Sequence, residues 1–156
     1  MEIQNRELHR VVGTAIIYKK EDGIFQYLLL KRSLDKKAFP GKWTVPGGGL
    51  EADDYLNTPK TTNDSWYFAL ENSLKREVKE ETNMDIGKPK YLLDLTFIRP
   101  DGIPVLTLSF YTPYEGGEVR LNNENIEYAW ASYEEAREYD LIEGILEEIA
   151  MVEKLL

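Results

Sequence analysis

The chain has 156 residues, 42% of them apolar and 12% aromatic, which suits one folded domain spanning residues 1–156. Its net charge of −9 argues against a nucleic-acid polymer as partner, because a sequence-independent grip on phosphates needs a basic surface. The chain has no cysteine and one histidine, which excludes thiolate zinc sites and histidine-rich metal centres. No apolar stretch has the length of a signal peptide or a membrane span, so we expect a cytoplasmic protein without membrane contact.

Apolar periodicity and turn-forming residues predict the order of the elements. In chain order, we expect strands at 11–18 and 25–31, a loop at 33–42, a short extended segment at 43–45, a glycine loop at 46–49, a further loop at 52–66, a helix at about 67–83, strands at 91–98, 105–112 and 126–131, a short helix at about 132–139 and an amphipathic helix at 141–156. This order predicts an α/β fold, with helices packed on both faces of a mixed sheet in an α/β/α sandwich.

Three carboxylates lie close together on the first long helix. At roughly 100° per residue, Glu77, Glu80 and Glu81 share one arc of the helix. Glu81 projects between Leu70 and Leu74, where a buried stripe favours an apolar side chain. A carboxylate in that place is costly unless a positive group meets it. The cluster therefore indicates a site for a hard cation such as Mg²⁺, which prefers oxygen ligands.

A glycine run precedes this helix. Pro46 is followed by Gly47, Gly48 and Gly49, and glycine permits both positive φ angles and a close approach of the backbone to a ligand. A triple glycine alone is weak support, because turns select glycine anyway. Its position before the acidic helix makes it part of the same predicted site.

Together these segments resemble the signature of the Nudix hydrolase family. That signature reads Gly, five residues, Glu, seven residues, then Arg-Glu-apolar-any-Glu-Glu-any-Gly-apolar. Residues 76–84 read Arg-Glu-Val-Lys-Glu-Glu-Thr-Asn-Met and match its second half at every position but one, and Gly48 matches its leading glycine. The resemblance extends over most of the chain, with its specificity concentrated in residues 43–84.

The chain departs from the signature at three places. Asn83 stands at the usual glycine, where asparagine is the next most tolerant residue for a left-handed helix end. Asp54 stands at the first glutamate. Twenty-one residues, rather than seven, separate Asp54 from Arg76. The 14 extra residues place Trp66 and Tyr67 where we expect either a lid or base-stacking surface near the site, or a loop that packs on its own domain.

The resemblance implies a role for each matching residue. Glu77, Glu80 and Glu81, with the Gly47 carbonyl, would hold Mg²⁺, or Mn²⁺ in its place. Arg76 would orient these ligands through Glu80 and Asp54, while Gly48 and Asp54 would brace the loop. For the general base, Glu80 is the first candidate, and four glutamates of later loops stay open: Glu115, Glu118, Glu124 and Glu127.

Substrate recognition is less defined by the sequence. Arg32 ends the second strand and is a candidate phosphate ligand, and Trp43 and Trp66 are candidates for stacking on a base. The resemblance implies metal-dependent hydrolysis of a pyrophosphate bond in a small nucleotide. Pro100, 16 residues after Met84, slightly favours ADP-ribose or a nucleotide sugar over a nucleoside triphosphate. The alternative is a non-catalytic nucleotide sensor, and the apolar C-terminal helix is compatible with a homodimer.

Overall fold

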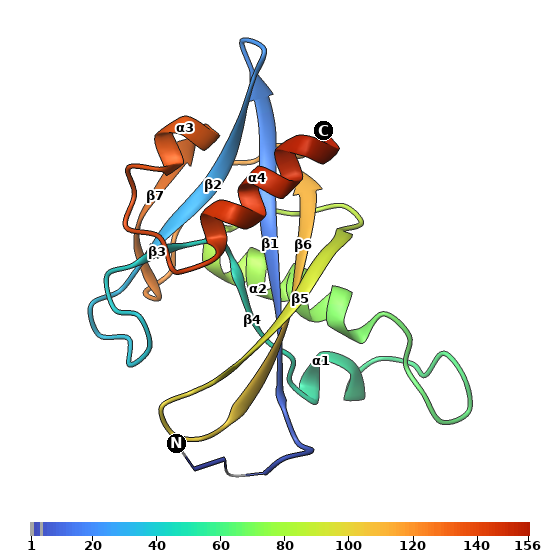
Figure 1. The fold of residues 1–156 in the computed structure, drawn as a ribbon. Helices are drawn as coiled ribbons and strands as arrows, with labels where there is room; N and C mark the ends of the chain where they lie inside the picture. Colours follow the sequence, from blue (N-terminus) through green and yellow to red (C-terminus); the bar gives the residue numbers. More distant parts are fainter. Residues whose placement is uncertain (1, 4) are drawn as a thin grey trace.

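A computed structural model describes residues 2–3 and 5–156. In this part of the chain, seven strands form one mixed sheet in the order β3–β2–β1–β6–β5, with β4 paired to β1 and β7 paired to β2 (Figure 1). The pairing of β1 with β6 is parallel and the other pairings are antiparallel. The strands are β1 (Arg10–Glu21), β2 (Ile24–Arg32), β3 (Trp43–Thr44), β4 (Gly47–Gly49), β5 (Lys90–Ile98), β6 (Pro104–Pro113) and β7 (Asn125–Ala131).

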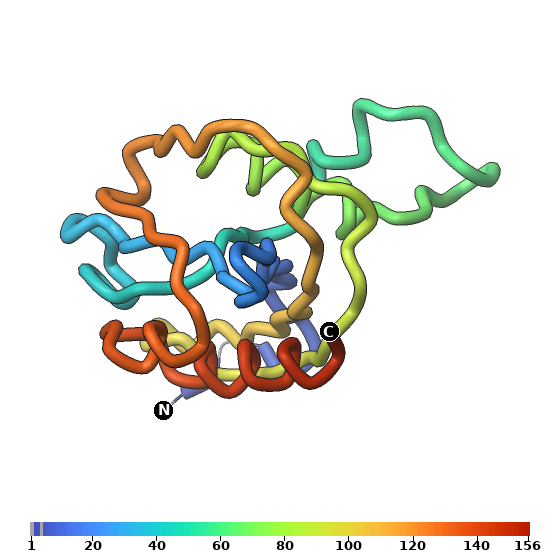
Figure 2. The backbone as a smooth tube through the Cα atoms, turned by 90° about the horizontal axis from the view of Figure 1, so that it is seen from above, coloured from blue at the N-terminus to red at the C-terminus, as the bar shows by residue number. Residues whose placement is uncertain are grey.

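Two longer helices cover the two faces of this sheet. Helix α2 (Ala69–Thr82) lies on one face and α4 (Ile145–Leu155) on the other, as the view in Figure 2 shows. Side chains alternate along β1, so Ile16 is buried in the core beneath α4 while Ala15 and Ile17 are buried in the core beneath α2. The predicted α/β/α sandwich with a mixed sheet is therefore confirmed. Two one-turn helices complete the fold: α1 (Asp53–Leu56) and α3 (Tyr133–Ala136).

Several element boundaries differ from those predicted. Helix α2 begins at Ala69 rather than near residue 67, because Phe68 has a left-handed φ of 60°. It ends before Asn83, whose φ of 64° gives the left-handed cap expected there. Helix α4 begins at Ile145 rather than 141, because Ile142 donates its N–H to the Trp43 carbonyl at 2.9 Å and Gly144 has a φ of 93°.

The segment predicted as a glycine loop is a strand. Gly47, Gly48 and Gly49 form β4 and pair with Thr14, Gly13 and Val12 of β1. None of the three is among the residues with positive φ in the described part of the chain. Glycine is needed at Gly47 for a close approach instead, since an added Cβ would lie 2.4 Å from the Gly13 carbonyl oxygen. No helix within the described residues has the length and apolar character required to cross a membrane.

One carboxyl group is buried beneath α4, away from the acidic face of α2. The side chain of Glu148 points toward the sheet and the residue is 5% exposed. Burial raises the pKa of this carboxyl, Glu147 adds to the rise, and the nearby hydroxyl of Ser109 on β6 partly offsets it. The folded protein therefore holds the proton of Glu148 more tightly than the unfolded chain does.

We predict that Glu148→Gln stabilises the protein more at pH 8 than at pH 5. The pKa of Glu148 is higher in the folded chain, so the stability it contributes is complete below its unfolded pKa of about 4.3 and is lost as pH rises through the folded pKa. Glutamine does not titrate and avoids this loss. Urea unfolding at both pH values measures the difference, with Glu143→Gln, an exposed glutamate just before the helix, as control. An equal gain at both pH values would contradict the prediction.

Candidate metal and catalytic site

Helix α2 holds two carboxylates at the edge of the core. Its apolar face buries Leu74 and Val78 against the sheet at 1% and 0% exposure. The same packing fixes Glu77 and Glu81, which are buried although they are charged residues. The predicted intrusion of Glu81 into the apolar stripe is present in the structure, and it requires a compensating positive group.

A third carboxylate joins these two from a distant part of the chain. Oxygen atoms of Glu77, Glu81 and Glu124 all lie within 4.8 Å of one another. Glu124 directly precedes β7, which pairs with β2, and its carbonyl accepts the N–H of Ser33 at 2.9 Å. The strand pairing therefore brings Glu124 to α2. We refer to these three side chains as the glutamate cluster.

The sequence had left Glu124 open only as one of four loop candidates for the general base. The other three lie elsewhere in the structure. Glu118 forms an ion pair with Arg120, Glu127 with Lys31, and the carboxylate of Glu115 lies against Gly87. Of the four candidates, the antiparallel register of β2 with β7 brings Glu124 to α2. A single sequence does not reveal that register.

The electrostatics of the cluster favour a bound cation. Burial, Glu124 and Glu77 together raise the pKa of Glu81 to about 8, although the Gly47 backbone and Arg32 oppose the rise. Burial also raises the pKa of Glu77, against the opposing effect of Arg76. A bound cation would favour the ionised form of both groups, because carboxylate ligands are deprotonated when they bind metal. Three carboxylates without nitrogen or sulfur ligands fit Mg²⁺ or Mn²⁺.

Strand β4 lies directly against this cluster. A Cβ added to Gly48 would lie 2.2 Å from the carboxyl carbon of Glu77, so only glycine permits this approach. The backbone of Gly47 hydrogen-bonds Glu81. The position of β4 is compatible with the predicted metal ligand at the Gly47 carbonyl, which stays a prediction.

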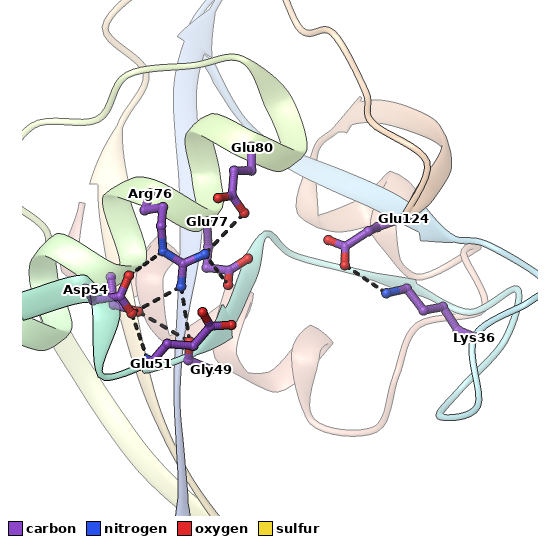
Figure 3. Close-up of polar contacts among 9 residues, drawn as sticks. Lys36, Gly49, Glu51, Asp54, Arg76, Glu77, Glu80 and Glu124 are labelled. Atoms are coloured by element: carbon purple, nitrogen blue, oxygen red, sulfur yellow. Dashed lines mark hydrogen bonds and ion pairs between the residues drawn. The ribbon is translucent and has the colours of Figure 1, made fainter.

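Arg76 connects α2 to the short helix α1 and to the end of β4 (Figure 3). Its guanidinium binds both carboxylate oxygens of Asp54, and its Nη2 donates to the Gly49 carbonyl at 3.3 Å. Asp54 also accepts the backbone N–H of Glu51 at 2.8 Å, and its side chain is 3% exposed. Burial alone would raise the pKa of Asp54, but these hydrogen bonds outweigh it and the pKa is lowered. The shorter aspartate thus reaches the arginine.

The same guanidinium also contacts two glutamates of α2. Its Nη1 lies 3.0 Å from Glu77 Oε1 and 3.2 Å from Glu80 Oε2. The side chain of Glu80 is 53% exposed, and Glu80 is not part of the glutamate cluster. The structure therefore brings Glu77 and Glu81 together with Glu124, while Glu80 lies beside Arg76 at the solvent edge (Figure 3).

Two basic side chains approach the cluster from the end of β2. Arg32 is close enough to Glu81 and Glu124 for both to oppose the fall in its pKa that burial causes. Its Nε donates to the Ala38 carbonyl at 3.0 Å, which folds the loop at 33–42 back on the strand. Lys36 of this loop lies 3.0 Å from Glu124 Oε1. The sequence analysis selected Arg32 and missed Lys36.

The two predicted stacking residues lie in other surroundings. Trp43 packs edge-to-face on Tyr139, with ring centroids 4.8 Å apart, beside the core beneath α4. Trp66 packs on Tyr55 at 5.2 Å and donates its indole N–H to the Thr58 carbonyl. Figure 2 shows the inserted loop projecting from the body of the molecule. Both side chains have packing partners here, and their substrate contacts stay predictions.

Comparison with known proteins identifies the family. A family model described as the NUDIX domain matches residues 7–150. The chain is 30% identical over 125 residues to "Nucleoside triphosphatase NudI" of Klebsiella pneumoniae (strain 342), covering 74% of this chain and 79% of that protein. The same relative from Escherichia coli O17:K52:H18 (strain UMN026 / ExPEC) is 30% identical over 129 residues, with the same coverage of each chain.

Solved structures share the fold. The MutT protein from Methanosarcina mazei Go1 has a TM-score of 0.71 at 25% identity, over 97% of this chain and 98% of that one. The NUDIX domain of Shewanella oneidensis NrtR, in complex with ADP ribose, has a TM-score of 0.75 at 17% identity, over 97% and 91%. With the signature and the cluster of carboxylates, these matches show that the chain belongs to the Nudix hydrolase family.

Proposed function

We propose that this Nudix pyrophosphohydrolase acts on nucleoside triphosphates and depends on Mg²⁺. The observation that carries the proposal is the glutamate cluster, whose oxygens lie within 4.8 Å of one another. Such a density of carboxylates suits the binding of divalent cations, and these would neutralise a polyphosphate whose negative charge otherwise repels an attacking water. The net charge of −9 is no obstacle, because bound cations reverse the local field.

The position of each residue in the site indicates its proposed role. Glu77, Glu81 and Glu124 would hold the metal, which polarises the phosphate and lowers the pKa of a bound water. Glu80 is more exposed and adjacent, so we retain it as the proposed base that accepts the proton of the attacking water. Arg76 would orient Glu77 and Glu80 without touching the substrate.

The proposed substrate class differs from the slight preference for ADP-ribose or a nucleotide sugar expected from Pro100. The name of the two reported relatives, nucleoside triphosphatase NudI, supports a triphosphate as the first candidate. Pro100 had favoured ADP-ribose, but it lies in the turn between β5 and β6, where Gly102 donates to the Arg99 carbonyl at 2.8 Å. A turn explains this proline without a substrate. The alternative of a non-catalytic sensor is less favoured, because the acidic residues of the signature are present and the two reported relatives are named as nucleoside triphosphatases.

A nucleotide panel tests the substrate assignment. With Mg²⁺, we predict that a nucleoside triphosphate yields a monophosphate and pyrophosphate, because hydrolysis falls at the bond next to the nucleoside phosphate. ADP-ribose would instead yield AMP and ribose 5-phosphate. Anion-exchange chromatography of the products separates these results. If kcat/KM is highest for ADP-ribose or a nucleotide sugar, the triphosphate assignment is wrong and the pyrophosphohydrolase assignment stands.

We predict that Glu81→Gln lowers kcat/KM by roughly 100-fold or more, because it removes a metal ligand. The same change should raise stability at pH 8 in metal-free buffer, since burial disfavours the charged form of Glu81 and its pKa is about 8. Thermal unfolding therefore separates a catalytic defect from misfolding. Activity close to that of the unchanged protein would contradict the assignment of Glu81.

We predict that Asp54→Asn lowers activity about tenfold, the lower end of the range for residues that orient metal ligands. The half-buried Arg76 guanidinium would lose its charged partner, so Glu77 and Glu80 would be held less firmly. Asp53→Asn, exposed at the neighbouring position, is the matched control. Equal activities of the two variants would mean that the pair of Asp54 and Arg76 has no orienting role.

A further inference from the structure

Lys36 pairs with the carboxylate that completes the glutamate cluster. Its Nζ lies 3.0 Å from Glu124 Oε1, and its side chain is 31% exposed (Figure 3). The same Glu124 side chain offers an oxygen within 4.8 Å of oxygens of Glu77 and Glu81. A divalent cation that takes all three carboxylates therefore meets the ammonium group of Lys36 at Glu124.

The backbone holds this contact in place. Ser33 donates its N–H to the Glu124 carbonyl at 2.9 Å, and Lys36 donates its N–H to the Ser33 carbonyl at 3.2 Å. Arg32 secures the far side of the loop through its bond to the Ala38 carbonyl. The loop thus returns Lys36 to Glu124 through bonds that do not involve either charged group. The backbone therefore fixes the position of Lys36, whereas a chance pair of two long surface side chains has no such support.

We propose that Lys36 neutralises Glu124 while the site lacks metal and passes to the phosphate oxygens of the substrate when the metal takes that carboxylate. The inference rests on the proposed function. Three neighbouring carboxylates repel one another, and a cation at Glu124 relieves this repulsion. A divalent ion that binds Glu124 reduces this repulsion in place of the lysine, and its positive charge repels the ammonium group. The polyphosphate that binds with the metal offers the lysine a new anionic partner.

Lys36 is accordingly a positioning residue with two opposite effects. It weakens the binding of metal to the free protein, because metal and ammonium compete for Glu124. It strengthens the binding of substrate to the metal-loaded protein, because the released ammonium group contacts phosphate. A residue that only held the loop together would weaken both when it is replaced.

The test compares Lys36→Gln with Lys37→Gln. Lys37 is the next residue of the same loop, is exposed, and forms none of the ion pairs found within residues 2–3 and 5–156, so its replacement makes the same change of net charge without the contact. Titration with Mn²⁺, followed by the electron paramagnetic resonance of the free ion without nucleotide, gives the metal Kd. We expect Lys36→Gln to bind Mn²⁺ about three- to fivefold more tightly than Lys37→Gln. Lys36→Arg, which keeps the charge, should resemble the unchanged protein.

The second readout is steady-state hydrolysis of a nucleoside triphosphate at saturating Mg²⁺. Lys36→Gln should raise KM about fivefold with a smaller change in kcat, since the lost contact is made to bound substrate. Mn²⁺ binding that is unchanged or weaker in Lys36→Gln, or an unchanged KM, would overturn the inference while the proposed function stands. If the unchanged protein neither binds Mn²⁺ nor hydrolyses any nucleotide, the proposed function itself fails, and the inference fails with it.

Discussion

The burial of two carboxylates on α2 is the constraint on which the rest of the site depends. Glu77 and Glu81 lie on the helix that packs Leu74 and Val78 into the core, so they cannot turn away to solvent without moving the helix. Burial raises the pKa of both groups, and with the nearby carboxylates of Glu124 and Glu77 it raises that of Glu81 to about 8. The surrounding structure supplies positive groups that can neutralise these two carboxylates.

Three separate segments provide those groups. The guanidinium of Arg76 joins α2 to Asp54 of α1, and β4 approaches Glu77 closely because Gly48 has no side chain. The paired ends of β2 and β7 bring Arg32, Lys36 and Glu124 to the same place. The sheet therefore joins the acidic helix to residues far away in sequence. The basic and acidic side chains of the site are already paired with one another. In the proposed function, a metal ion would take the place of a basic partner and a phosphate group the place of an acidic one.

Much of the fold follows from local patterns in the sequence. The apolar residues at 11–18 predicted the first strand, the spacing of Leu70, Leu74 and Val78 predicted the helix that carries the glutamates, and the order of the elements predicted helices on both faces of the sheet. Boundaries were less accurate where tertiary contacts decide them, as at Ile142, whose bond to Trp43 delays the start of α4. The glycine run favoured a loop because glycine has wide conformational freedom. Its actual constraint is the lack of space beside Gly13 and Glu77, which only the packed structure reveals.

The candidate site was predictable to the extent that its residues are close in sequence. Glu124 and Lys36 were not, because their contribution depends on the register of β2 with β7. The central claim is that Glu77, Glu81 and Glu124 bind one metal ion together. A crystal structure of the protein soaked with Mn²⁺, with anomalous differences recorded, tests this claim most directly. We predict an anomalous peak in contact with all three carboxylates, and a protein that binds Mn²⁺ only at other carboxylates would contradict it.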